Sequence, residues 1–319
     1  MKKVTVLGGS GFVGSSLVAK LDAAGYQVTV ISRRRESAKH LILLPKVQVV
    51  QCDIYDQHKL KSMLEGSFAV INLVGILHES GRSSFEQVHH QLPRRLAQLC
   101  VELGIDRLIH MGALQAGKSA PSQYLRSKAA GESAVSEFNK KLNVTIFKPS
   151  IIFGRHDSFF NLFASLVKML PVIVLAKPDA KFQPIWVEDV TSCMVNALEN
   201  TDTYSKTYEL GGPQVYTFRE LIQKVMTILG VSRPIIGLSD KLSYLQGFAM
   251  EFMPVKLMSR DNVRSMRVDS VTTQALAPEL GVSLMPLEAV VPEYLTNATP
   301  RGAYDAFRSA AGRAINAKR

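Results

Sequence analysis

The stretch that most constrains the fold is VTVLGGSGFVGSSLVAKL at residues 4–21. Gly8, Gly11 and Gly14 stand three apart between a β-branched run and a helical pattern. Glycine at such a turn lets the backbone approach a pyrophosphate, whose charge is attracted by the free N–H groups of the following helix. A glycine triplet alone is a weak signal. Between a strand and a helix at the start of a βαβ unit, it predicts a bound dinucleotide.

Short apolar runs alternate with helical patterns through the first half of the chain. Such alternation implies right-handed crossovers and a parallel, doubly wound α/β sheet. Near-continuous apolar strands are typical of a sheet that is covered on both faces. The predicted strands are residues 4–8, 27–33, 47–53, 68–75, 107–113 and 144–150.

Beyond residue 150 the pattern loosens. Residues 159–176 are long and apolar enough to suggest a membrane span, but Lys168 and Pro171 favour a buried helix followed by a strand. Residues 218–230 have the spacing of an amphipathic helix. Residues 242–258 are rich in Met and Phe, which is typical of a core and also suits an adaptable apolar pocket.

The formal net charge is 38 − 27 = +11. This excess suits an anionic cofactor or an anionic membrane surface, and it also fits a basic chain with no such partner. Nucleic acid is not expected, because the sequence shows no helix-turn-helix, zinc finger or aromatic–basic stripe. Residues 300–319 form a basic tail with helical spacing, which either lies on an anionic membrane or is a solvated helix.

The three cysteines, Cys52, Cys100 and Cys193, are far apart and form no CxxC pattern. We therefore expect no disulfide framework, no metal site and a reducing compartment. The N-terminus MKKVTVLGG runs straight into glycines, so it predicts a cytoplasmic strand rather than a signal peptide. The predicted location is cytoplasmic, with peripheral contact at the inner face of the membrane as an addition.

The second predicted strand ends in Ser32, followed by Arg33 and Arg34. A chain selective for NAD usually has an acid here for the ribose 2′-hydroxyl, and that acid would repel a 2′-phosphate. Arginine instead forms charged hydrogen bonds to a phosphate. The pattern favours NADP(H), with NAD(H) as the alternative; solvated arginines at a helix start are the other interpretation.

The third and fourth predicted strands end in further cofactor candidates. Asp53 can accept a hydrogen bond from the adenine amino group while Ile54 packs on the ring. Leu73, Val74 and Gly75 offer an apolar approach to the ribose. Ordinary turn chemistry explains the same residues, so only their order along the sheet favours a site.

Tyr124 and Lys128 stand four apart, which places them on one face of a helix. A nearby ammonium lowers a tyrosine pKa, so this pair can exchange a proton with a carbonyl or alcohol. The same spacing recurs at Tyr55 and Lys59, which shows that chance can produce it. Only Tyr124 follows the fifth strand, where it would face a nicotinamide.

Together these residues resemble the extended and atypical short-chain dehydrogenase/reductases. Within that group the sequence resembles one branch more than the rest, that of the NADPH-binding accessory subunit of respiratory complex I and its bacterial homologues. It is carried by QYLRSKAAGE, IFKPSIIFGRHDSFFNLFASLV, FQPIWVEDV, TYELGGPQVYTFRELI and LGVSLMPLEAVVPEYL. It extends over nearly the whole chain, from the first strand to about residue 295.

The resemblance implies a Rossmann-type core at residues 1–155, to which segments near 183–212 return. A smaller mixed α/β part at 156–299 covers the substrate cleft, and 300–319 is the tail. The implied nucleotide contacts include Lys128 as a holder of the nicotinamide ribose. The full cofactor set is Gly8, Ser10, Gly11, Phe12, Val13, Gly14, Ser32, Arg33, Arg34, Asp53, Ile54, Leu73, Val74, Gly75, Tyr124, Lys128, Pro149 and Ile151.

The chain departs from the active enzymes of the family at one position. They carry a serine or threonine after the fifth strand, where this chain has Met111, Gly112 and Ala113. Loss of one preorganised donor costs about 10²–10³ in rate. His110, Gln115 or a water could replace it.

Three functions remain open. The first is a protein that holds NADPH with weak or no turnover and supports a respiratory or quinone-related system. The second is an active NADP-dependent oxidoreductase on a small or isoprenoid carbonyl or quinone-type substrate. The third is a regulator that senses NADPH through a protein partner.

Overall fold

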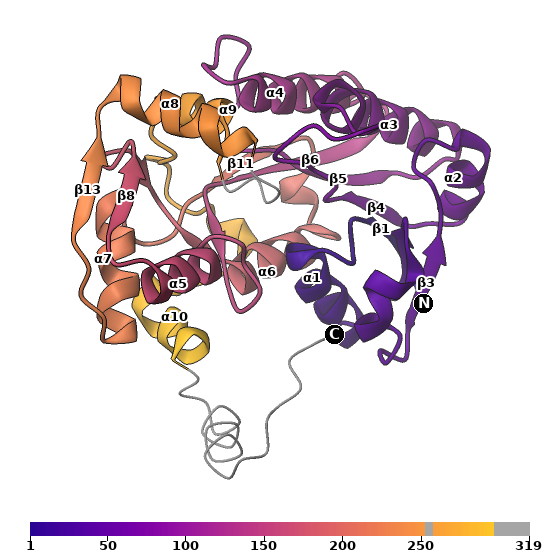
Figure 1. The fold of residues 1–319 in the computed structure, drawn as a ribbon. Coiled ribbons are helices and arrows are strands. Elements are labelled where there is room, and N and C mark those ends of the chain that lie inside the picture. The colour runs from indigo at the N-terminus through magenta and orange to yellow at the C-terminus, as the bar shows by residue number, and fades with distance from the viewer. Residues whose placement is uncertain (253–257, 297–319) are drawn as a thin grey trace.

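The computed structural model describes residues 1–252 and 258–296 (Figure 1). Its centre is a seven-stranded parallel sheet in the order β11-β6-β5-β4-β1-β2-β3. All six predicted strands are present in it, which confirms the α/β prediction. The strands are β1 (Lys3–Leu7), β2 (Gln27–Ser32), β3 (Val47–Gln51), β4 (Ala69–Asn72), β5 (Arg107–Met111), β6 (Asn143–Pro149) and β11 (Thr207–Leu210).

Helices cover both faces of this sheet (Figure 1). On one face, α1 (Phe12–Ala23) and α6 (Val187–Ala197) pack against each other and against the apolar strand residues. The other face carries α2 (Gln57–Leu64), α3 (Leu92–Glu102) and α4 (Gln123–Ser136). Shorter helical turns are η1 (Arg35–Leu41), η2 (Glu86–Gln91, a π-turn), η3 (Thr201–Thr203) and η4 (Pro278–Leu280).

Apart from α6 and β11, the described residues after β6 build three two-stranded sheets and five α-helices beside the carboxyl ends of the central strands. β7 (Ile152–Phe153) pairs with β10 (Ile185–Trp186), β8 (Ile173–Ala176) with β13 (Ile235–Leu238), and β9 (Lys181–Phe182) with β12 (Tyr216–Thr217). The helices are α5 (Phe160–Met169), α7 (Phe218–Leu229), α8 (Asp240–Glu251), α9 (Arg260–Ser265) and, last, α10 (Leu287–Leu295).

The predictions for this part are mostly confirmed. Residues 159–176 form α5 and β8, a helix followed by a strand. No described helix is both long and apolar enough to cross a membrane. Residues 218–230 form α7, which starts at a Thr217–Glu220 capping box and ends at Gly230 with φ 65°.

The core interpretation of residues 242–258 is wrong for α8. Leu242, Leu245 and Phe248 are exposed, because the face of α8 that packs inward carries small residues instead. The basic tail at 300–319 lies outside the described residues. The division into parts at residues 155 and 156 stays a prediction, although β11 does pair with β6 in the central sheet.

Candidate functional site

A cavity of about 620 Å³ opens where the central strands end and the later helices begin. Eleven of the predicted site residues line it, drawn from the turns after β1 and β4, the start of α1, the end of β6 with the loop after it, and α4. They are Gly8, Gly11, Phe12, Val13, Gly14, Leu73, Gly75, Tyr124, Lys128, Pro149 and Ile151. The cavity lies at the carboxyl ends of parallel strands, where ligands bind in open α/β sheets.

The glycine turn has the geometry that a pyrophosphate requires. Gly8 has φ +82°, a backbone conformation that favours glycine. A Cβ on Gly14 would lie 2.2 Å from the Gly8 carbonyl oxygen, so only glycine lets α1 approach β1 this closely. The first turn of α1 has no side-chain cap and no acidic residue, which leaves its N–H groups available to an anion.

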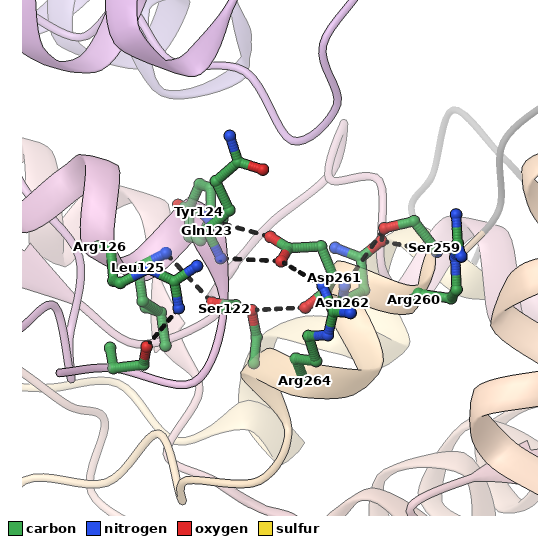
Figure 2. A network of polar contacts seen from close by, with 12 residues as sticks. Ser122, Gln123, Tyr124, Leu125, Arg126, Ser259, Arg260, Asp261, Asn262 and Arg264 are labelled. Carbon is green, nitrogen blue, oxygen red and sulfur yellow. Dashed lines mark hydrogen bonds and ion pairs between the residues drawn. The ribbon is translucent and has the colours of Figure 1, made fainter. Parts of the chain in front are cut away.

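The helix that carries Tyr124 is held at its N-terminus by two side chains (Figure 2). The Ser122 hydroxyl accepts a hydrogen bond from the Leu125 N–H at 3.1 Å. Asp261 of α9 accepts from the N–H groups of Gln123 at 2.8 Å and Tyr124 at 2.9 Å. A carboxylate here also complements the positive end of the helix dipole. The later part of the chain therefore helps to position the Tyr–Lys helix.

Tyr124 and Lys128 lie on α4 and both line the cavity, as their spacing predicts. The Lys128 ammonium is buried and donates a 2.9 Å hydrogen bond to the Met111 carbonyl oxygen. Burial lowers the pKa of Lys128 to about 8, against a smaller opposing effect of Glu132. In the copy at Tyr55 and Lys59, Tyr55 lies before α2, so that spacing does not form a helical pair.

The expected lowering of the Tyr124 pKa is wrong. Burial raises the pKa of Tyr124 to about 12, and the charge of Glu132 raises it further. The phenol oxygen makes no hydrogen bond to any residue that the structure describes. An isolated, half-buried phenol holds its proton at neutral pH, because the ionised form has lost water and gained no partner.

A buried histidine supports the same helix from η2. His89 Nε2 accepts a hydrogen bond from the Ile76 N–H at 3.0 Å, so the ring proton lies on Nδ1, 2.8 Å from the Ser127 hydroxyl. Ser127 in turn donates to the Tyr124 carbonyl oxygen at 2.7 Å. Burial, and then the charge of Lys128, lower the pKa of His89 to about 3, so the ring stays neutral.

Glu132 occupies the space beside the missing serine or threonine. Its carboxylate accepts a 3.1 Å hydrogen bond from the Ala113 N–H and forms an ion pair with Lys148 at 3.4 Å. A Cβ on Gly112 would lie 2.3 Å from Glu132 Oε1, so a serine at that position would displace the carboxylate. Burial is the first cause of a raised Glu132 pKa, and Lys148 opposes it.

The two proposed replacements for the hydroxyl have different surroundings. His110 is fully buried between β4 and α4, is hydrogen-bonded through Nδ1 to the Asn72 amide at 3.2 Å and does not line the cavity. Gln115 does line it, but its amide nitrogen donates to the Val271 carbonyl oxygen at 2.9 Å. His110 therefore does not reach the cavity beside Tyr124, and the Gln115 amide is directed toward Val271.

A second hollow, of about 580 Å³, lies beside the ends of β2 and β3 and is lined by Arg33, Asp53, Lys59 and Arg82. None of its three cations forms an ion pair with a described residue. Asp53 is exposed and accepts a 3.1 Å hydrogen bond from the Tyr55 N–H. This hollow suits the adenosine end of a dinucleotide.

The remaining predicted residues do not line either hollow. Ser32 is buried and donates to the Arg34 carbonyl oxygen at 2.9 Å, and its hydroxyl lies 3.4 Å from that of Ser10. Arg34 is exposed. Ile54 is buried in the core and Val74 packs against the same cluster, and the packing of Ile54 on adenine stays a prediction.

Sequence reasoning did not include Lys59 or Arg82 in the cofactor set, nor the distal wall of the cavity. That wall is largely apolar and is built by Ile76, Leu77, Phe159, Phe182, Met266 and Val268, with the polar Asn262, Ser265 and Ser270 among them. Phe182 belongs to β9 and Asn262 and Ser265 to α9, while the other residues lie in loops or at the ends of elements and carry no local pattern. The methionines and phenylalanines of the later chain were the available signal, since such residues suit an adaptable apolar pocket.

Comparison with known proteins agrees with this geometry. The model of the NAD dependent epimerase/dehydratase family matches residues 4–211. The chain is 33% identical over 299 residues to subunit 9 of the NADH dehydrogenase (ubiquinone) 1 alpha subcomplex of Arabidopsis thaliana, covering 90% of this chain and 73% of that protein. Its mouse counterpart is 36% identical over 228 residues, which cover 69% of this chain and 59% of the mouse protein.

Among solved structures, the chain is similar to a dTDP-glucose 4,6-dehydratase double mutant from Streptomyces venezuelae with NAD bound. The TM-score is 0.73 at 20% identity, over 94% of this chain and 98% of that one, which shows a shared fold. The glycine turn, the parallel sheet and the matched residues together support one conclusion. The chain belongs to the NAD dependent epimerase/dehydratase family and is a nicotinamide-dinucleotide-binding Rossmann protein of the short-chain dehydrogenase/reductase type.

Proposed function

We propose that this protein holds NADP(H) with weak or no turnover, in support of a respiratory or quinone-related system. The observation that carries the proposal is the absence of a hydrogen-bond partner for the Tyr124 hydroxyl among the described residues. Its pKa near 12 adds to this, because a general acid or base works best with a pKa near the operating pH. Active enzymes of the family carry a serine or threonine after the fifth strand, where this chain has Met111, Gly112 and Ala113 and no hydroxyl.

The residues present fit the cofactor. The α1 N-terminus and the Gly8 turn suit the pyrophosphate, and Lys128 lies where it would hold the nicotinamide ribose. Arg33, Lys59 and Arg82 would bind a 2′-phosphate at the adenosine end, because these three cations form no ion pair with a described residue and outnumber the two carboxylates of the hollow, Asp53 and Asp56. This supports NADP(H) over NAD(H), and Arg33 has the central role.

The proposed link to a respiratory system rests on the relatives, which are named as subunits of NADH dehydrogenase (ubiquinone). We propose a protein partner of that kind. Detergent extraction of membranes that contain the tagged chain checks this. If the chain binds such a system, NADH:quinone oxidoreductase activity should copurify with the tagged chain on an affinity column. The same column loaded with an untagged control extract should not retain that activity.

The first experiment identifies the nucleotide that copurifies by mass spectrometry and measures the Kd for NADPH and NADH by calorimetry. We expect NADPH on the protein and about tenfold or greater preference for it, the size of a charged hydrogen-bond pair. A screen with quinones and carbonyl compounds should leave bound NADPH unoxidised. Rapid oxidation that Tyr124→Phe abolishes without changing the Kd for NADPH would exclude the holding function.

The apolar distal wall favours one alternative, an active NADP-dependent oxidoreductase on a lipophilic carbonyl or quinone-type compound. The bound cofactor would supply the hydride. Tyr124 would donate its phenol proton to the carbonyl oxygen, and Lys128 would position the ribose and favour the phenolate that remains. Isoprenoid tails would pack on the large apolar side chains of Phe159, Phe182 and Met266, and the polar Asn262, Ser265 and Ser270 of the same wall could hold a carbonyl head group.

A further inference from the structure

The surface helix α8 carries its large apolar side chains outward. Leu242, Leu245, Phe248 and Phe252 follow one another at spacings of three, three and four residues, which places them on one stripe. They are 52%, 59%, 41% and 76% exposed, in that order. The Phe248 and Phe252 rings also contact each other edge to face at 5.1 Å.

The opposite face of α8 is small and polar, and it is the face that packs inward. Ser243 is fully buried, with its hydroxyl bonded to the Lys177 N–H and the Leu238 carbonyl oxygen. A Cβ on Gly247 would come within 3.1 Å of the Arg260 backbone nitrogen, so α9 packs directly on this glycine. The helix is therefore inverted relative to a surface helix of a free globular protein, whose apolar face packs on the core.

The stripe continues onto the neighbouring two-stranded sheet. Val174 of β8 and Ile236 of β13 are direct register partners and are 44% and 52% exposed. The Gln246 amide of α8 bonds to the Val174 carbonyl oxygen at 3.2 Å, which joins the two elements. Large exposed apolar patches of this kind mark interaction sites rather than ordinary surface.

The charges beside the stripe select the kind of partner. Lys241 is exposed on the outward side of α8 and has no ion-pair partner within the described part of the chain. Lys177 pairs with Asp240 at 2.8 Å, and Arg267 also acts on that carboxylate. Three cations thus face one acid at the start of α8, in a chain of net charge +11. Apolar side chains flanked by an excess of positive charge, here three cations to one acid, suit an anionic lipid surface.

We propose that the outward stripe of α8, with Val174 and Ile236, docks the protein on the surface of an anionic lipid bilayer. This site is separate from the basic tail and does not depend on cofactor binding. Docking on this face places α8 between the lipid and α9, which packs on the inward face of α8 and lines the cleft. Figure 1 shows α8 in orange at the edge of the molecule, with the central sheet on its other side.

Cosedimentation of the full chain with vesicles tests the proposal. Vesicles of phosphatidylcholine with an equal amount of phosphatidylglycerol should bind the protein, and vesicles of phosphatidylcholine alone should bind it less. The double variant Leu245→Ser and Phe252→Ser should weaken binding by about tenfold or more, because two apolar side chains no longer enter the interface. The matched control is Leu43→Ser with Met285→Ser, at two exposed apolar positions outside the stripe.

A chain that ends at residue 299 separates the stripe from the tail. Vesicle binding that survives this truncation and is lost in the double variant supports docking through α8. Failure of the wild-type chain to bind vesicles, equal binding by the double variant, or loss only on truncation overturns it. So does a dimer in sedimentation velocity that the double variant converts to a monomer. NADPH affinity is measured alongside, so failure of docking is distinct from failure of the cofactor proposal.

Discussion

The Tyr124 backbone N–H donates a 2.9 Å hydrogen bond to Asp261 Oδ2, which joins the Tyr–Lys helix to α9 (Figure 2). Asp261 also accepts a hydrogen bond from the Gln123 N–H, so one carboxylate pairs with two of the backbone donors that the start of α4 leaves without helical partners. The later part of the chain therefore contributes to the position of the phenol as well as to the wall of the cleft.

Asp261→Ala should destabilise the protein by about 1–2 kcal/mol, since it removes a charged cap from α4. Chemical denaturation checks this, with Asp179→Ala, at an exposed aspartate, as the control. The Kd for NADPH should also rise, because Lys128 lies on the same helix. An unchanged free energy of unfolding would show that Asp261 does not hold α4.

Arg33→Ala should weaken NADPH binding by about 10–100-fold and leave NADH binding nearly unchanged, because only the 2′-phosphate loses a charged hydrogen-bond partner. Calorimetry with both nucleotides measures the ratio. Arg35→Ala is the matched control, since Arg35 lines a different hollow. Equal losses for the two nucleotides would place Arg33 outside the 2′-phosphate site.

Lys128 should make stability depend on pH above neutrality. Its pKa is lowered to about 8 in the folded protein from 10.5, so between these values the unfolded chain binds more protons. Stability contributed by this group therefore rises as pH increases from about 8 to 10.5. The unfolding free energy of the wild type minus that of Lys128→Met should therefore increase as the pH rises over that range. A constant difference would mean that Lys128 is not buried as a cation at neutral pH.

Gly112→Ser should destabilise the protein by about 1–3 kcal/mol, because the new Cβ lies within 2.3 Å of Glu132 Oε1. Glu132→Ala removes that clash, so the double variant should lose less stability than the two single variants combined. A thermodynamic cycle from four denaturation curves gives the coupling energy, expected at about 0.5–3 kcal/mol. Additive losses would show that residue 112 and Glu132 do not compete for space.

Local patterns predicted the strands well because buried parallel strands need apolar residues throughout their length. The glycine turn was equally readable, since φ +82° at Gly8 and the close packing at Gly14 each favour glycine. The spacing of Tyr124 and Lys128 also predicted their common face. In each case a short segment carries the whole constraint.

The same patterns failed where the constraint comes from distant residues. Spacing indicated a lowered Tyr124 pKa, but the burial that raises it comes from packing. The apolar residues of α8 suggested a core, yet Ser243 and Gly247 form the buried face. Nothing near Gly112 in the sequence shows that Glu132 fills the space beside it.

By itself, the sequence determined the parallel α/β fold, the dinucleotide turn and the lack of a hydroxyl after β5, because each depends on neighbouring residues and their steric or hydrogen-bonding needs. Only the tertiary structure decided which cations share a hollow, that Asp261 caps the helix of Tyr124, and which face of α8 meets solvent. These depend on segments that meet after the chain has packed, and packing joins residues that sequence separation leaves unrelated.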